Sequence, residues 1–192
     1  MRWEWAAPNV AIVVAGVAGV IGVSTSTSAF AVQYYSVEAA QKALFPSAAT
    51  FQPAALRLSA AQRDVVAERS NTRVPRNLRV HAWTAHDASG ASLGSFLSDE
   101  VTGKHEMIAY AVAVSPDGHV LAIEILDYRE SYGEQIRGVR WRDQFRGKTA
   151  SDPLKLDKDI VNLTGATLSC SHVTEGVRRL LAIHELVLKT AR

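Results

Sequence analysis

Thr164-Gly165-Ala166-Thr167-Leu168-Ser169 is the segment of this sequence whose residue types are best suited to chemistry. Its side chains are small, three of them carry hydroxyl groups, and an amphipathic helical pattern follows directly. Such a loop offers free backbone N–H groups, a helix N-terminus and a nucleophilic oxygen, which together make a phosphate cradle. The alternative is a turn whose Thr and Ser side chains cap the helix, and for these six residues alone this simpler interpretation is the commoner one.

Three blocks of residues upstream reverse that preference. Gly103-Lys104-His105-Glu106 precedes a strand pattern, and Ile125–Gly133 and Phe145-Arg146-Gly147-Lys148 follow it along the chain. With the 164–169 segment, these blocks resemble, in the same order, those of exported members of the FMN-binding domain family. That family includes the FMN-carrying subunits of the Rnf complex and of the sodium-pumping NADH:quinone oxidoreductase. The resemblance covers most of residues 32–188 and is strongest over 103–188.

The resemblance implies a covalent cofactor. In the family's (S/T)GAT(x)(S/T) signature the second threonine, here Thr167, receives FMN through a phosphoester bond made by a Mg-dependent flavin transferase. The rest of the signature is expected to contact FMN as well, namely Thr164, Gly165, Ala166, Leu168 and Ser169. The implied function is an electron relay between extracytoplasmic or membrane redox partners, in which the flavin supplies the chemistry and the protein its orientation.

Four residues outside the signature are further candidates for contact with FMN. The resemblance implies that Glu130, Ser131 and Gly133 line the isoalloxazine or ribityl group, although Glu130 could instead form a surface ion pair with Arg129. Lys148 is a candidate countercharge for the phosphate, and a solvated lysine at a helix end describes it equally well.

One position departs from the family pattern. Flavin transferase targets usually carry an acidic residue six positions before the modified threonine, where this chain has Val161. Asp159, two residues earlier, is the candidate to take over that role.

The single cysteine and the histidines are expected to be structural. One cysteine, Cys170, excludes an intramolecular disulfide and a cysteine-based metal cluster, and we expect it to be buried at the start of the last helix. His105 and His184 have no second His or Cys at ligand spacing, so we predict a surface and a core position and no metal site. We find no catalytic pair of residues, which disfavours an exported flavin enzyme with its own substrate. A non-redox exported binding module of the same fold is the main alternative to a carrier.

Residues 1–31 have the features of an export signal. Val10–Val23 is an uninterrupted apolar run after a short charged head, and Ala29-Phe30-Ala31 offers the small-x-small pattern of a cleavage site. We therefore expect a signal peptide that is cleaved after Ala31. The alternative is a membrane anchor over residues 7–28, which is long enough to span the hydrocarbon core. Both interpretations place the remainder in the periplasm or another extracytoplasmic space.

Charge and length describe the rest of the chain. The 192 residues carry a net charge of +2, and the basic residues are spread along the chain and not gathered in blocks, so nucleic acid is not an expected partner. Residues 32–192 are of a length typical of one domain.

The hydropathy pattern predicts an α+β fold in which helices pack against an antiparallel sheet. Periodicity and capping residues predict helices at 37–45, 60–69, 139–146 and 171–189. Alternation predicts strands at 78–84, 93–101, 108–114 and 120–126. Pro116-Asp117-Gly118 joins the last two strands in a hairpin, which we expect to form the centre of the sheet.

Overall fold

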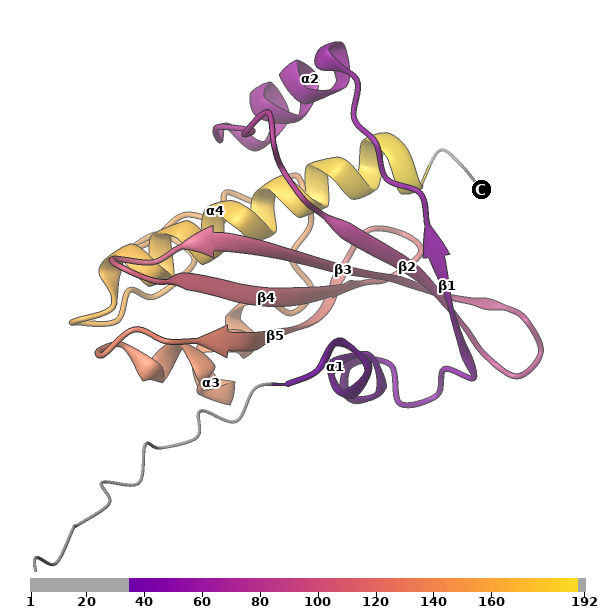
Figure 1. The fold of residues 1–192 in the computed structure, drawn as a ribbon, viewed down its shortest axis with the longest axis horizontal. Helices are drawn as coiled ribbons and strands as arrows, with labels where there is room; N and C mark the ends of the chain where they lie inside the picture. The colour runs from indigo at the N-terminus through magenta and orange to yellow at the C-terminus, as the bar shows by residue number, and fades with distance from the viewer. Residues whose placement is uncertain (1–34, 190–192) are drawn as a thin grey trace, which may run out of the picture. The chain divides into compact units, whose positions relative to one another are not determined.

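The computed structural model describes residues 35–189, so the predicted leader and its cleavage site lie outside the described residues. Five strands form one antiparallel sheet in the order β1-β2-β3-β4-β5 (Figure 1). The strands are β1 Thr50–Ala54, β2 His81–His86, β3 Ser92–Thr102, β4 Met107–Val114 and β5 Val120–Tyr128. Because helices pack against this sheet, the predicted α+β fold is confirmed.

The helices within these residues agree with most of the predicted ranges. They are α1 Val37–Leu44, α2 Ala60–Ser70, α3 Val139–Arg142 and α4 Thr167–Ile183, with 3-10 turns at Glu134–Arg137 and Asp143–Phe145 and a π-helical turn at His184–Leu188. Ser36 and Ser59 begin α1 and α2 by accepting hydrogen bonds of 3.1 Å from backbone N–H groups three residues later. Side-chain caps therefore fix where both helices start.

Alternating side chains of β4 divide the core between the two faces of the sheet. Tyr110 and its neighbours at every second position pack with Val177 and other apolar residues of α4. Ala111 belongs to a second buried cluster, which contains Phe45 at the end of α1. As a result α1 and α4 lie on opposite faces of the sheet (Figure 1).

The position of the predicted hairpin in the sheet was wrong. The β4–β5 pair forms as predicted around Pro116-Asp117-Gly118, but β3 is the middle strand and β5 lies at an edge. The opposite edge is β1, which was not among the predicted strands and which contains Pro53. Proline cannot donate a backbone hydrogen bond, so an edge strand is where a sheet accepts it.

The last helix begins earlier than predicted. The pattern placed its start at residue 171, whereas α4 begins at Thr167 and so includes the second half of the signature. Its 17 residues run to Ile183, and the π-helical turn continues to Leu188. Among residues 35–189, no helix combines the length and the apolar character needed to cross a membrane.

Candidate functional site

The first turn of α4 presents unoccupied backbone donors. The N-cap residue is Ala166, and no side chain makes a capping hydrogen bond. Within residues 35–189 the N–H groups of Thr167, Leu168 and Ser169 have no acceptor, and the first bonded amide of the helix is that of Cys170, 2.8 Å from the oxygen of Ala166. The interpretation of the segment as a turn capped by its own hydroxyl groups is therefore wrong. The donors remain available to an anion, which the helix dipole also favours.

Thr167 is accessible at this helix end. Its side chain is exposed, and its Oγ1 atom lies 3.4 Å from Nδ2 of Asn162, a long contact for a hydrogen bond. Gly165 has φ +84°, and a Cβ atom placed there would meet no atom of the described chain within 4 Å. Open space thus adjoins the free donors and the exposed hydroxyl group, an arrangement that fits a phosphate group and its ester.

Gly133 lies directly against the signature. A Cβ atom on this residue would lie 2.6 Å from Cβ of Ala166 and 2.6 Å from the hydroxyl oxygen of Tyr128. Its φ of +88° also favours glycine. The structure therefore brings one of the predicted flavin-lining residues into contact with the signature, although the two are separated by more than thirty positions in the sequence.

Tyr128 joins these two segments. Its hydroxyl group donates a 2.5 Å hydrogen bond to the backbone oxygen of Tyr132 and lies 3.2 Å from Oγ of Ser169. Burial raises the pKa of this phenol, so it stays protonated and available as a donor at neutral pH. The Ser169 side chain is buried, which places it inside the helix start and away from the surface that Thr167 occupies.

Glu130 holds a neighbouring turn. Its Oε1 atom accepts hydrogen bonds from the backbone N–H groups of His105 at 2.6 Å and Glu106 at 3.0 Å. Desolvation raises the pKa of this carboxyl, but the hydrogen bonds from the backbone outweigh it and lower the pKa overall. Gly103 permits the contact, since a Cβ there would lie 2.4 Å from the same oxygen. This carboxylate is thus bonded to the 103–106 turn.

The neighbours of Glu130 in the sequence make fewer contacts. Arg129 pairs with Asp127 at 2.9 Å, whereas the Glu130 carboxylate accepts from the backbone of the 103–106 turn. Ser131 is exposed, and its hydroxyl group has no hydrogen-bond partner among residues 35–189. The structure therefore places Gly133 at the signature, whereas it gives Ser131 no described contact there.

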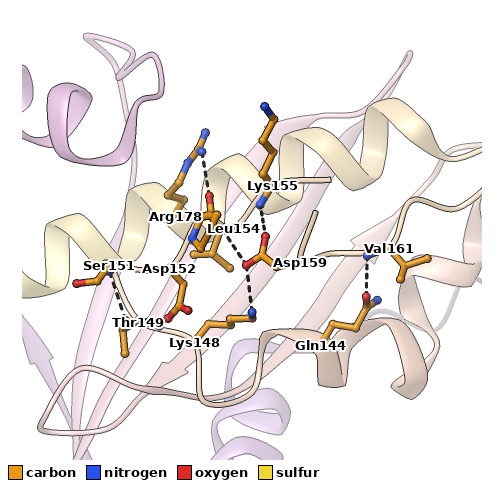
Figure 2. A network of polar contacts seen from close by, with 11 residues as sticks. Gln144, Lys148, Thr149, Ser151, Asp152, Leu154, Lys155, Asp159, Val161 and Arg178 are labelled. Carbon is orange, nitrogen blue, oxygen red and sulfur yellow. Dashed lines mark hydrogen bonds and ion pairs between the residues drawn. The ribbon is translucent and has the colours of Figure 1, made fainter. Parts of the chain in front are cut away.

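Lys148 is paired with Asp159 (Figure 2). The distance between Nζ and Oδ2 is 3.0 Å, and the two side chains are 23% and 16% exposed. Asp159 also accepts from the backbone N–H groups of Leu154 at 3.1 Å and Lys155 at 2.8 Å. Burial acts to raise the pKa of the Asp159 carboxyl, but these donors more than offset it, so the pKa lies below its ordinary value. The expectation of a solvated lysine is wrong, and its charge already has a carboxylate partner.

Val161 lies on the surface near the end of the same loop. Its side chain is 63% exposed, and its backbone is held by Gln144, whose Oε1 accepts from the Val161 N–H at 2.7 Å (Figure 2). The indole N–H of Trp141 donates to the Val161 oxygen at 3.0 Å. Position 161, which departs from the family pattern, is therefore held through its backbone. Its exposed side chain can be substituted without loss of these hydrogen bonds.

The burial of Cys170, His184 and His105 agrees with the prediction of two core positions and one surface position. Cys170 and His184 are fully buried, and burial raises the pKa of the Cys170 thiol. His105 is exposed. In the described part of the chain no group of three or more His, Cys, Asp and Glu side chains could hold a metal ion.

Two residues at the site were not singled out from the sequence. Tyr128 lies inside the block that carries the resemblance, and a tyrosine at the end of a strand, before a glycine-containing turn, is a signal that could have identified it. Asn162 lies five residues before Thr167, and nothing in the pattern distinguishes it.

Comparisons with known proteins bear on this arrangement. Residues 103–182 match the model of the FMN-binding domain family. A curated relative, one of the subunits of the proton-translocating ferredoxin:NAD(+) oxidoreductase complex of Clostridium ljungdahlii, is 32% identical over 104 residues, which are 50% of this chain and 56% of that protein. The match thus spans about half the length of that relative.

Among solved structures, NqrC of Shewanella oneidensis is similar, with a TM-score of 0.42 and 17% identity over 75% of this chain and 68% of that one. The segment matched by the family model contains the signature, the 125–133 block and the 103–106 turn. Residues 103–182 of this chain are therefore similar to the FMN-binding domain family, in agreement with the resemblance that their motifs carry.

Proposed function

We propose that this protein carries FMN attached through a phosphoester to Thr167 and relays electrons between redox partners outside the cytoplasm or at the membrane. The observation that carries the proposal is the first turn of α4, where an exposed threonine hydroxyl adjoins three backbone N–H groups without an acceptor in the described chain. A phosphoester at Thr167 would place its anionic oxygens beside these donors and at the positive end of the helix dipole.

The attachment step balances as a transfer from FAD. A flavin transferase with Mg²⁺ would direct the Thr167 hydroxyl oxygen to the flavin-side phosphorus of FAD. The new Thr167 O–P bond forms as the pyrophosphate P–O bond breaks, AMP leaves, and the hydroxyl proton passes to a base of the transferase. No electrons are exchanged in this step. The contribution of this chain is an accessible acceptor hydroxyl group and open space beside Gly165.

Electron transfer rather than catalysis on a substrate of its own is the proposed activity. The curated relative is by its name a subunit of a ferredoxin:NAD(+) oxidoreductase complex, which supports redox proteins as partners. Bound FMN would supply the electron chemistry, and the protein would hold and orient it.

Export of the domain is part of the proposal and rests on residues 1–31. A signal peptide ending at Ala31, or an anchor over residues 7–28, would deliver the domain to an extracytoplasmic space. A reversibly bound flavin would be lost to a dilute medium there, whereas a tethered flavin keeps a high effective concentration at its site. Covalent attachment therefore suits the proposed location.

The test is flavin incorporation into the full chain co-expressed with a flavin transferase. The wild type should gain the mass of FMN less one water and show flavin fluorescence after denaturing electrophoresis. Thr167→Ala should lose both signals, while Thr50→Ala, which removes an exposed hydroxyl group from the edge strand β1, should keep them. Label that persists in Thr167→Ala, or that maps to Thr164 or Ser169, would contradict the assignment.

A further inference from the structure

The hydroxyl group of Tyr128 connects the sheet to two other parts of the site. It donates to the backbone oxygen of Tyr132 at 2.5 Å and lies 3.2 Å from Oγ of Ser169 in α4. It also lies 2.6 Å from where a Cβ on Gly133 would be. Since Tyr128 is the last residue of β5, the sheet, the 130–133 turn and the first turn of α4 meet at one oxygen atom.

The first turn of α4 has few other polar restraints. Its N-cap residue, Ala166, provides no side-chain hydrogen bond, and the Thr167 hydroxyl has only the 3.4 Å contact from Asn162. Ser169 follows Thr167 by two residues, about 3 Å along the helix axis. A restraint on the Ser169 side chain therefore acts on the same helical turn that presents Thr167.

We infer that Tyr128 is a positioning residue for flavin attachment: its hydroxyl group fixes the first turn of α4 against the 130–133 turn and so holds the Thr167 hydroxyl as an acceptor. This inference rests on the proposed function, because attachment at Thr167 is itself proposed. Tyr128 acts through Ser169 and the Tyr132 backbone, and the bond to phosphorus is made by Thr167 alone.

Two tyrosine variants separate positioning from general stability. Tyr128→Phe removes only the hydroxyl group of interest. Tyr110→Phe is the matched control, because Tyr110 is also buried and its hydroxyl group donates to Asp99 at 3.0 Å. That hydroxyl lies under Gly176, nine residues beyond Thr167 and about 14 Å farther along the helix. Tyr128→Phe loses the hydrogen bond to Tyr132 and the contact with Ser169, whereas Tyr110→Phe loses the hydrogen bond to Asp99, so only the first variant loses a contact at the first turn of α4.

The measurement is the steady-state kinetics of flavin incorporation, with purified flavin transferase, FAD and each full-length variant as the protein substrate. We expect Tyr128→Phe to lower kcat about fivefold, the scale of one buried hydrogen bond, and to keep KM within about twofold because the exposed residues around Thr167 are unchanged. Tyr110→Phe should lower the Tm and leave kcat and KM as in the wild type. Ser169→Ala should lower kcat to a similar extent, and the double variant with Tyr128→Phe should show little further loss.

A second readout does not depend on flavin. Hydrogen exchange of the backbone amides at 170–173 in the unlabelled proteins should be faster in Tyr128→Phe than in the wild type or Tyr110→Phe. If wild type and Tyr128→Phe incorporate flavin with equal kcat, or if Tyr110→Phe is slowed as much as Tyr128→Phe, the positioning role is overturned. Absence of incorporation into the wild type overturns the proposed function itself, so the two failures are distinguishable. Should Tyr128→Phe not fold, Ser169→Ala provides the same comparison.

Discussion

The ammonium group of Lys148 and the carboxylate of Asp159 form an ion pair, with 3.0 Å between Nζ and Oδ2. The same carboxylate accepts hydrogen bonds from two backbone N–H groups, those of Leu154 and Lys155 (Figure 2). These bonds close the loop from residue 154 to residue 159. Leu154 has a φ of +43°, a conformation that a non-glycine residue adopts only when neighbouring contacts hold it. Asp159 is therefore a structural centre of the 148–161 segment.

Asp159→Asn should lower the free energy of unfolding by about 1–3 kcal/mol at pH 7, because it removes a charged acceptor of three hydrogen bonds. The folded-state pKa of Asp159 is lowered, so its stabilisation is fully present above the unfolded pKa of about 3.9 and is lost as the pH falls through the folded pKa. The difference between wild type and variant should therefore shrink below about pH 4. Urea denaturation at several pH values measures it. Asp157→Asn, at an exposed position of the same loop, is the control and should change little. A difference that is independent of pH would contradict the argument.

Val161→Asp should leave stability nearly unchanged, because the side chain is 63% exposed and its backbone contacts do not involve it. We expect the initial rate of flavin incorporation to rise modestly, on the order of twofold, since a carboxylate at this position can aid encounter with the transferase or hold its Mg²⁺. Val139→Asp, at a valine that is 61% exposed, is the control for an added negative charge. Equal rates in all three proteins would show that recognition does not depend on an acidic residue at position 161.

The competing hypothesis assigns that acidic role to Asp159. Three donors already occupy the carboxylate of Asp159. We therefore expect Asp159→Asn to slow flavin incorporation only to the extent that it destabilises the 148–161 segment. At temperatures chosen so that the variant and the wild type have equal free energies of unfolding, their rates of flavin incorporation should then be equal. A rate loss that remains after such matching would instead support direct recognition of Asp159.

Gly133→Ala should be strongly destabilising, by about 3 kcal/mol or more. The new methyl group would lie 2.6 Å from both Ala166 and the Tyr128 hydroxyl, and the residue would keep a φ of +88°. Gly147→Ala is the matched control, since Gly147 has a φ of +76° and no atom of the described chain within 4 Å of the added carbon. It should cost only about 1–2 kcal/mol, the cost of the left-handed conformation. Chemical denaturation of both variants compares these costs, and equal losses would mean that the contact with Ala166 is unimportant.

Arg179→Met should lower stability by about 3–5 kcal/mol, because it leaves the buried carboxylate of Asp99 without its 2.6 Å ionic partner. Combining it with Asp99→Asn should recover part of the loss, since the double variant buries no charge. Denaturant titration of the single and double variants gives the coupling energy. Additive losses would indicate that the pair is not coupled.

If the chain is exported as we propose, the mature protein should begin at Val32, because Ala29-Phe30-Ala31 provides the cleavage pattern. N-terminal sequencing of the extracytoplasmic fraction tests this expectation, and Ala31→Leu should block processing. Recovery of the full-length chain from membranes after carbonate extraction would instead support an anchor over residues 7–28.

The local chemistry of the chain was accessible from the sequence. Helix caps and tight turns are formed by residues that are close together in the sequence. For this reason the caps at Ser36 and Ser59 and the Pro-Asp-Gly turn predicted helices and the β4–β5 pair. The family match over residues 103–182 confirms the resemblance that the motifs of that segment carry. Attachment of FMN at Thr167 stays a prediction.

Only the tertiary structure decided which groups meet. Three contacts join segments whose approach is fixed by the packing of α4 and the loops on the sheet. They are the contact of Gly133 with Ala166, the contact of Tyr128 with Ser169 and the ion pair of Lys148 with Asp159. Hydrophobic periodicity records which face of an element is buried, but it does not specify the partner of that face or the strand order. For the same reason β1 and the start of α4 at Thr167 could not be predicted: cross-strand pairing holds a proline-containing edge, and the free first turn has no side-chain cap to mark it.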